Sequence, residues 1–307
     1  MPLHRLTAIT VGVPNVEATA AYYTDFGLTP LPNHAFATAD GGEQFRLAYS
    51  AQRKLMEIGI GVDDSDDLDR IERQLVALGL PVDRSSDAVS TWEPIAGFRA
   101  VISIAPRLIQ ARCEPTPYNG PGRIDRSDGR APGIEREGAV VPRKLGHLVI
   151  GSTDQAATQR FFTDGIGFKI SDEVPNFAAF MRCSTDHHNV LVQQSPVNFL
   201  HHTAWQVDDI DEVGRGAMAM LTNNPERHVW GLGRHHIGSN FFWYLKDPAG
   251  NFSEYYSDID CIVEDALWTP GMWDAARALC NWGPPPPPSF VMPEDLAAMM
   301  AGAHSPS

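Results

Sequence analysis

The chain has 307 residues, of which 43% are hydrophobic, and a formal net charge of −14 at pH 7. This length suits two domains or one large one, and the acidic balance argues against nucleic acid as a partner because no basic stripe is present to neutralise phosphates. The four cysteines are widely spaced without a CxxC pair, no apolar run approaches the ~18 residues of a membrane span, and no signal-peptide pattern is present. We therefore predict a soluble, cytoplasmic protein that binds no membrane.

The chain contains an internal repeat. Residues 6–30 (LTAITVGVPNVEATAAYYTDFGLTP) and residues 145–170 (LGHLVIGSTDQAATQRFFTDGIGFKI) both run from a strand through a turn into an amphipathic helix. A second similarity joins GVDD at 61–64 to QVDD at 206–209, where Asp64 and Asp209 are predicted helix N-caps. A period of about 140 residues is too long for a solenoid. It predicts an α+β fold of tandem duplicated β-α-β-β-β modules in two domains.

The composition along the chain predicts four segments. Residues 1–113 form an N-terminal module pair, and residues 114–142 form a linker rich in Gly, Pro, Arg and Asp. Residues 143–262 form the second domain. Residues 263–307 form a tail whose proline run at 284–288 is predicted to be a stiff spacer or a rim element.

Three strand-like segments of the second copy each carry a residue able to ligate a metal. They are KLGHLVIG at 144–151 with His147, LHHTAWQVD at 200–208 with His201 and His202, and FSEYY at 252–256 with Glu254, which follows a DPAGN turn. This pattern is typical of a 2-His-1-carboxylate site for non-haem Fe(II). The alternative is a set of core histidines beside a glutamate paired with an arginine. Eight of the 11 histidines lie between residues 147 and 236, and this clustering favours the metal site.

The duplication provides a comparison within one chain. In the ungapped alignment His147 corresponds to Ala8, and His202 corresponds to Glu57; with one inserted residue, Glu254 falls near Val101. A residue that the fold required would recur in both copies. The contrast therefore predicts that the first copy binds no metal. It also predicts that the three residues of the second copy are present for function rather than for the fold.

Further motifs of the second copy resemble one family. GHLVI at 146–150, DHHN at 186–189, HHTAW at 201–205 and LGRHH at 232–236, with Tyr244 ten residues before Glu254, are similar to the catalytic domain of type I extradiol (catechol meta-cleavage) dioxygenases of the vicinal oxygen chelate, or glyoxalase-like, superfamily. The resemblance covers both copies. It implies Fe(II), with Mn(II) as the alternative ion, held by His147, His202 and Glu254. It also implies a small aromatic diol and O2 as substrates and a homo-oligomeric enzyme.

The resemblance implies roles for three further residues. His188 matches the acid–base histidine of the family, His235 matches its second active-site histidine, and Tyr244 matches its tyrosine. The last two would hydrogen-bond the substrate oxygens, and the product would be a 2-hydroxymuconic-semialdehyde type of compound. The neighbouring His187, His201 and His236 are expected to be structural or solvent-facing members of their pairs.

The alternation of side chains along strands predicts the pocket wall, since residues two apart share a face. By this rule His201 faces away from His202. The predicted wall consists of Val149 beside His147, Val190 beside His188, Ala204 beside His202, Phe242 beside Tyr244 and Phe252 beside Glu254. This wall is apolar and suits a flat aromatic ring. Arg182 and Arg234 are the candidates for reaching the pocket from its edge.

Two other functional classes remain open. One is a metal-dependent isomerase or lyase on the same scaffold, which would not require His188, His235 and Tyr244 together. The other is a metal-free small-molecule-binding protein, against which the intact ligand set of the second copy argues. A yellow product formed from catechols and O2 would distinguish the dioxygenase from both.

Overall fold

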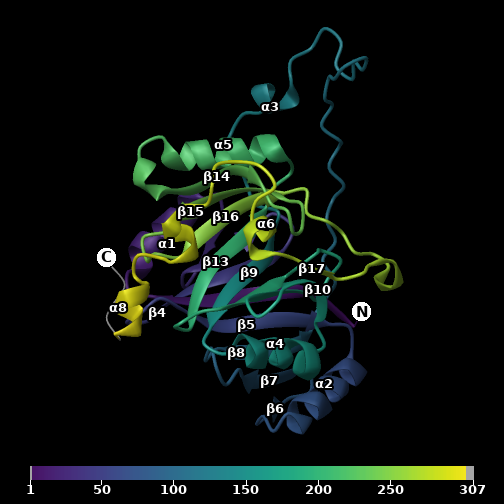
Figure 1. The fold of residues 1–307 in the computed structure, drawn as a ribbon, viewed down its shortest axis with the longest axis vertical. Helices are drawn as coiled ribbons and strands as arrows, with labels where there is room; N and C mark the ends of the chain where they lie inside the picture. Colours follow the sequence, from purple (N-terminus) through teal and green to yellow (C-terminus); the bar gives the residue numbers. More distant parts are fainter. Residues whose placement is uncertain (1, 302–307) are drawn as a thin grey trace.

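The computed structural model describes residues 2–301 and contains two mixed β-sheets (Figure 1). The first sheet has the strand order β2-β3-β4-β1-β5-β8-β7-β6. Its strands are β1 (Leu3–Val13), β2 (Thr29–Leu31), β3 (Ala35–Thr38), β4 (Gly42–Tyr49), β5 (Lys54–Val62), β6 (Asp83–Arg84), β7 (Ala88–Trp92) and β8 (Arg99–Ile104). Two helices belong to this half of the chain, α1 (Val16–Asp25) and α2 (Ser65–Ala77).

The second sheet has the order β14-β15-β16-β13-β9-β12-β11-β10-β17. Its strands are β9 (Lys144–Ser152), β10 (Lys169–Val174), β11 (Ala178–Arg182), β12 (Val190–Gln194), β13 (Phe199–Gln206), β14 (His228–Arg234), β15 (Phe241–Lys246), β16 (Phe252–Ser257) and β17 (Gly271–Met272). Its helices are α4 (Gln155–Arg160), which continues into a π-helical turn at Phe161–Ile166, and α5 (Ile210–Leu221); a short 3-10 helix spans Pro225–Arg227.

The order of elements confirms the tandem β-α-β-β-β architecture, and each sheet is built from two such modules. In both halves the first strands of the two modules pair antiparallel at the centre of the sheet, β1 with β5 and β9 with β13. The predicted N-caps are also present. The Asp64 side chain accepts hydrogen bonds from two backbone N–H groups of α2, and that of Asp209 accepts one from α5.

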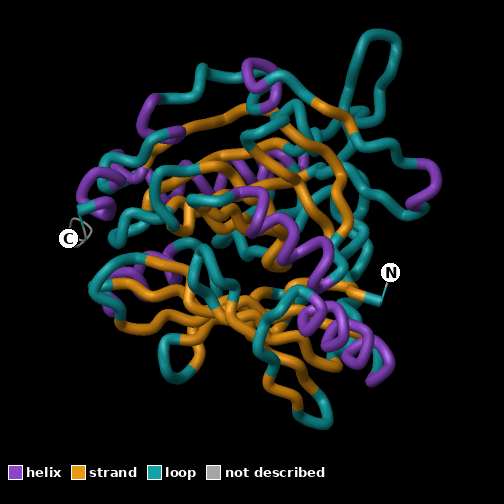
Figure 2. Tube along the Cα trace, turned by 60° about the horizontal axis from the view of Figure 1, so that its bottom comes forward, coloured by secondary structure: helices purple, strands orange, loops and turns teal. Residues whose placement is uncertain are grey.

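One hydrophobic core joins the two sheets, which form the lower and upper halves of the view in Figure 2. The ring of Phe26 stacks on that of Tyr255 with centroids 3.8 Å apart, and the Tyr255 hydroxyl donates a 2.6 Å hydrogen bond to the Phe26 carbonyl. Phe45 packs edge-on against Trp205. Because Trp205 lies on the opposite face of β13 from His202, the first half of the chain supports the back of this strand.

The segment between the sheets is extended and projects from the body at the top of Figure 1. Its one helix is α3 (Pro132–Glu135). After β16 the tail contains a 3-10 turn (Asp265–Leu267) and the short helices α6 (Ala275–Ala278), α7 (Pro288–Val291) and α8 (Leu296–Met300). No helix within residues 2–301 is long and apolar enough to cross a membrane.

Candidate metal centre

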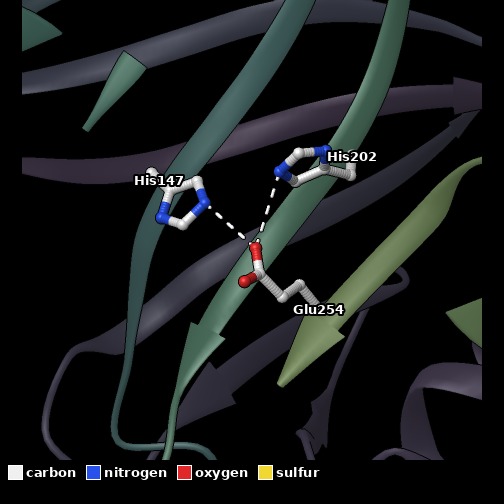
Figure 3. A group of neighbouring side chains, drawn as sticks. All are labelled: His147, His202 and Glu254. Carbon is white, nitrogen blue, oxygen red and sulfur yellow. Dashed lines mark ion pairs between the residues drawn. The ribbon is translucent and has the colours of Figure 1, made fainter. Parts of the chain in front are cut away.

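Three neighbouring strands bring His147, His202 and Glu254 together. Ala204 on β13 pairs with His147 on β9 and with Glu254 on β16. Cross-strand partners share a face of the sheet, so the imidazole and the carboxylate flank the small Ala204 methyl group with no larger side chain between them. His202 lies two residues earlier on the same face. Figure 3 shows the three side chains converging.

The ligand atoms of this triad form a buried cluster in which any two lie within 4.8 Å of each other. Glu254 Oε2 lies 3.1 Å from His147 Nε2 and 3.5 Å from His202 Nε2, and the three residues are 0–5% exposed. Within the described chain, Glu254 Oε2 and His202 Nε2 have no hydrogen-bond partner. A buried carboxylate oxygen without such a partner is costly, and a divalent cation satisfies all three atoms at once. The donor set therefore fits a metal.

Two features of the surroundings prepare these groups for a cation. Asn240 Nδ2 donates a 3.0 Å hydrogen bond to Glu254 Oε1, which orients the carboxylate so that Oε2 faces the histidines. Burial lowers the pKa of His202 well below its usual value. This imidazole is therefore neutral, as a metal ligand must be.

The equivalent position in the first sheet lacks these ligands. There Gly59 pairs with Val101 as Ala204 pairs with Glu254, which agrees with the alignment made from the sequence. Glu57 forms an ion pair with Arg99 in which both side chains are about 40% exposed, at 39% and 43%. Within residues 2–301 the triad of the second sheet is the only group of three such side chains with this geometry.

His201 does not face away from His202, and this expectation is wrong. The pairing of β13 with β9 shifts between Leu200 and His202, so that His201 is the extra residue of a β-bulge. Its Nδ1 lies 2.8 Å from His202 Nδ1, and its Nε2 lies 2.7 Å from the Phe290 carbonyl, to which it can donate. The alternation rule fails here because a bulge breaks the period of two.

His188 lies at the same cavity, on a loop between β11 and β12 rather than on a strand. Its ring centroid is 4.3 Å from that of His147, and burial is the main reason that its pKa lies well below the usual value. Asn189 fixes this loop by donating to the Gly146 carbonyl on β9. His187 is completely buried, which excludes the solvent-facing alternative considered for it, and it contacts His188 through a 3.1 Å Nδ1–Nδ1 distance.

His235 and Tyr244 form a hydrogen-bonded pair at the edge of the triad. Tyr244 on β15 is the cross-strand partner of Glu254, and its hydroxyl lies 2.8 Å from His235 Nε2. His235 Nδ1 contacts the carbonyl of Leu279 in the tail. Burial, the largest influence on both groups, lowers the pKa of His235 and raises the pKa of Tyr244 well above its usual value, so the tyrosine is a neutral donor.

These histidines surround a small, largely apolar cavity. Of the five predicted wall residues, Val149 lines it. Its cross-strand partner Leu191 takes the place expected for Val190, which points into the main core, because His188 is not on a strand and the period of two cannot be counted from it. The remaining lining residues are Phe180, Gln193, Ile237, Ala278, Leu279 and Phe290, together with His147, His188, His201, His202, His235 and Tyr244.

The other three predicted wall residues lie one layer behind the cavity. Ala204 separates two members of the triad, Phe242 stacks on the His235 ring at 4.0 Å, and Phe252 packs between His201 and the tail. These three residues lie on the predicted face of the sheet, but other side chains lie between them and the cavity. Residues of the tail line the cavity instead. No local pattern in the sequence indicates that these tail residues reach it.

Neither arginine suggested for the pocket edge reaches the cavity. Arg182 donates to the Ile170 carbonyl, to Ser171 and to Asp265. Arg234 pairs with Asp258 and lies over the ring of Phe241. Among the described residues, no lysine or arginine lines the cavity.

Comparisons with known proteins show which proteins the chain resembles. Residues 144–255 match the model of the Glyoxalase/Bleomycin resistance protein/Dioxygenase superfamily. The chain is 30% identical over 303 residues to metapyrocatechase 2 of Cupriavidus necator, covering 94% of this chain and 92% of that one.

Two solved structures share the fold. The Mn(II)-bound glyoxalase of Novosphingobium aromaticivorans has a TM-score of 0.75 at 23% identity, with 94% of each chain covered. Homoprotocatechuate 2,3-dioxygenase of Brevibacterium fuscum has a TM-score of 0.75 at 17% identity, covering 94% of this chain and 91% of that one. With near-complete coverage of a metapyrocatechase at 30% identity, this chain belongs to the type I extradiol, meta-cleaving dioxygenases of the vicinal oxygen chelate superfamily.

Proposed function

We propose that the protein binds one Fe(II) per chain through His147, His202 and Glu254 and uses O2 to open the ring of a catechol, giving a 2-hydroxymuconic-semialdehyde-type product. The observation that carries this proposal is the set of buried Nε2 and Oε2 atoms within 4.8 Å of one another, two of which lack hydrogen-bond partners in the described chain. A metal bound there supplies a positive charge that favours the ionised catechol and a common template for both substrates.

The residues around the cavity supply positioning and proton transfer. We assign His188 as the group that takes a proton from a substrate hydroxyl and returns it to an oxygen during ring opening. The Tyr244 hydroxyl and His235 Nε2, 2.8 Å apart, are assigned as hydrogen-bonding partners of the substrate oxygens. Burial keeps these groups away from bulk water, which strengthens their interactions with the substrate.

The lining of the cavity supports a neutral catechol as the substrate. Val149, Leu191 and Ile237 form an apolar wall, and the described residues offer no cation to it. A ring carrying a carboxylate would lose its hydration there without gaining a partner. Catechol and alkyl- or aryl-substituted catechols are therefore expected to be cleaved in preference to dihydroxybenzoates.

The wider organisation is also proposed. We assign residues 1–113 to a metal-free domain, 114–142 to a linker, 143–262 to the catalytic domain and 263–307 to a tail. The first sheet ends at Ile104 and the second begins at Lys144, which supports a linker between them. All four cysteines are free thiols, which supports a reducing cytoplasm as the location. We propose a homo-oligomer, with its mass in solution as the test.

The test is ring cleavage by protein purified without oxygen and loaded with Fe(II) or Mn(II) in parallel. Formation of a yellow product with uptake of one O2 per catechol supports the proposal, and the more active metal identifies the cofactor. Glu254→Gln should abolish metal binding and turnover. Glu57→Gln, the same substitution at the position of the first sheet that corresponds to His202, is the control and should retain both. Conversion of substrate without O2 would indicate an isomerase or lyase, and binding without conversion would indicate a sequestering protein.

A further inference from the structure

His187 connects a buried carboxylate to His188. Its Nε2 lies 3.1 Å from Asp172 Oδ2, and its Nδ1 lies 3.1 Å from His188 Nδ1. Asp172 lies on β10 and is 5% exposed, and its other oxygen accepts a 2.6 Å hydrogen bond from the Gly271 N–H. The roles assigned to the site above use neither Asp172 nor His187, yet both belong to one continuous line of hydrogen bonds that ends at the cavity.

This line of hydrogen bonds has one consistent direction. A carboxylate oxygen can only accept, so the hydrogen between Asp172 and His187 is on His187 Nε2. Nδ1 of a neutral His187 then accepts, and the hydrogen between the two imidazoles is on His188 Nδ1. Nε2 is therefore the nitrogen of His188 left to exchange a proton. It has no hydrogen-bond partner among the described residues, and the ring lines the cavity.

The same arrangement recurs at the neighbouring histidine pair. His201 Nε2 is anchored to the Phe290 carbonyl at 2.7 Å, and its Nδ1 lies 2.8 Å from His202 Nδ1. The Nε2 of His202 is thereby left to face Glu254. In both pairs one histidine, called the outer one here, is held at Nε2 by an acceptor that is not a metal ligand, and the other, the inner one, presents its Nε2 to the cavity or to Glu254. The two anchors are independent, and both leave Nε2 of the inner histidine free of the pair. This repetition argues that each outer histidine sets the tautomer of its inner neighbour.

We propose that Asp172 and His187 are positioning residues that hold His188 as the Nδ1–H tautomer, with Nε2 directed to the substrate. This inference rests on the proposed function through the acid–base role of His188. When Nε2 takes a proton from a substrate hydroxyl, His188 carries hydrogen on both nitrogens. Its Nδ1–H bond to His187 is retained, and the Asp172 carboxylate lies beyond to stabilise the positive charge. Nε2 later returns the same proton to an oxygen of the opened ring.

The variant Asp172→Asn tests the inference because it changes hydrogen-bond direction with little change in shape. The Gly271 N–H requires an acceptor, so the Asn oxygen faces it and the Asn NH2 faces His187 Nε2. His187 must then accept at Nε2 and donate from Nδ1, which moves the His188 proton to Nε2. We expect kcat to fall on the order of 10²–10⁴-fold, with KM and metal content close to wild type.

The second readout is the tautomer itself, from ¹⁵N-histidine NMR of the metal-free full-length protein, with the His188 signals assigned by their loss in His188→Gln. Wild-type protein should show hydrogen on Nδ1 of His188, and Asp172→Asn should show it on Nε2. Asp258→Asn, at a carboxylate that is 61% exposed in its pair with Arg234, is the matched control and should change neither readout.

Several outcomes would overturn the inference. They are hydrogen on Nε2 of His188 in the wild type, or an unchanged tautomer or an unchanged kcat in Asp172→Asn. If that variant does not fold, His187→Phe removes the acceptor while keeping a ring, and unchanged turnover there contradicts the inference. The wild-type spectrum, once its His188 signals are assigned with His188→Gln, decides the tautomer without Asp172→Asn. Failure of the proposed function would appear separately, as a wild type that cleaves no catechol whatever its spectrum.

Discussion

The tail is held over the cavity by a buried ion pair with the first half of the chain. The Arg53 side chain is fully buried in the loop between β4 and β5. It donates to both oxygens of Asp295 at 2.6 and 2.9 Å and to the Leu200 carbonyl at 2.6 Å. Arg53 thus joins the tail to the start of β13, two residues before His202. We predict that Arg53→Met releases this connection.

The expected cost follows from burial. Asp295 is 6% exposed, so the variant takes the guanidinium away from a carboxylate that water hardly reaches. Removing one partner of a buried ion pair typically costs about 3–5 kcal/mol. This is a large part of a domain stability of roughly 5–15 kcal/mol. Because three of the lost hydrogen bonds reach the tail or the strand beside it, detachment of the tail is expected before global unfolding.

The assay combines urea unfolding with limited proteolysis of the tail. Arg53→Met should lower the unfolding free energy by about 3 kcal/mol or more and speed cleavage within residues 263–301. Arg46→Met is the control because its pair with Glu43 has side chains 46% and 41% exposed; it should cost less than about 1 kcal/mol. The double variant Arg53→Met/Asp295→Leu should regain most of the stability. An Arg53→Met protein as stable and protease-resistant as the wild type would refute the reasoning.

Three further predictions concern the metal centre. His202→Ala should reduce bound metal from one per chain to none in elemental analysis, and full occupancy in that variant would remove it from the ligand set. His188→Gln should retain metal while turnover falls on the order of 10²–10⁴-fold, so parallel loss of metal would instead indicate a structural role. The metal-free protein should lose stability as pH falls from about 6.5 towards 4, because burial lowers the pKa of His201 to about 4 and the unfolded chain then binds more protons. That residue contributes up to about 3 kcal/mol to the change, and urea unfolding that is unchanged between about pH 7.5 and 5 would contradict the prediction.

The repeat and the triad were predictable from the sequence because both depend on local regularities. A strand alternates its side chains with a period of two, so the contrast between His147 and Ala8 or between Glu254 and Val101 can be read by aligning two copies of one pattern. The structure pairs Gly59 with Val101 and Ala204 with Glu254, as that alignment requires. The family followed from several motifs together, since a chance match of all of them is improbable.

The surroundings of the triad were decided by contacts between distant parts of the chain. Whether His201 faces away from His202 depends on a bulge, and a bulge belongs to the register between two strands rather than to either one. Leu279 and Phe290, which line the cavity, come from a tail whose proline run indicates a stiff spacer or a rim element but not which residues reach the cavity. The pairing of Arg53 with Asp295 spans 242 residues.

Sequence alone therefore determined which residue types meet and on which strands, because the period of a strand is a local property. Tertiary structure decided which hydrogen bonds these residues make. His187 illustrates the difference, because the sequence assigns a catalytic role to His188 and only a structural or solvent-facing place to His187. The pairing of β10 with β11 and with β17 of the tail places Asp172 Oδ2 3.1 Å from His187 Nε2. The direction of a hydrogen bond depends on the partner at its far end, and that partner is chosen by the fold.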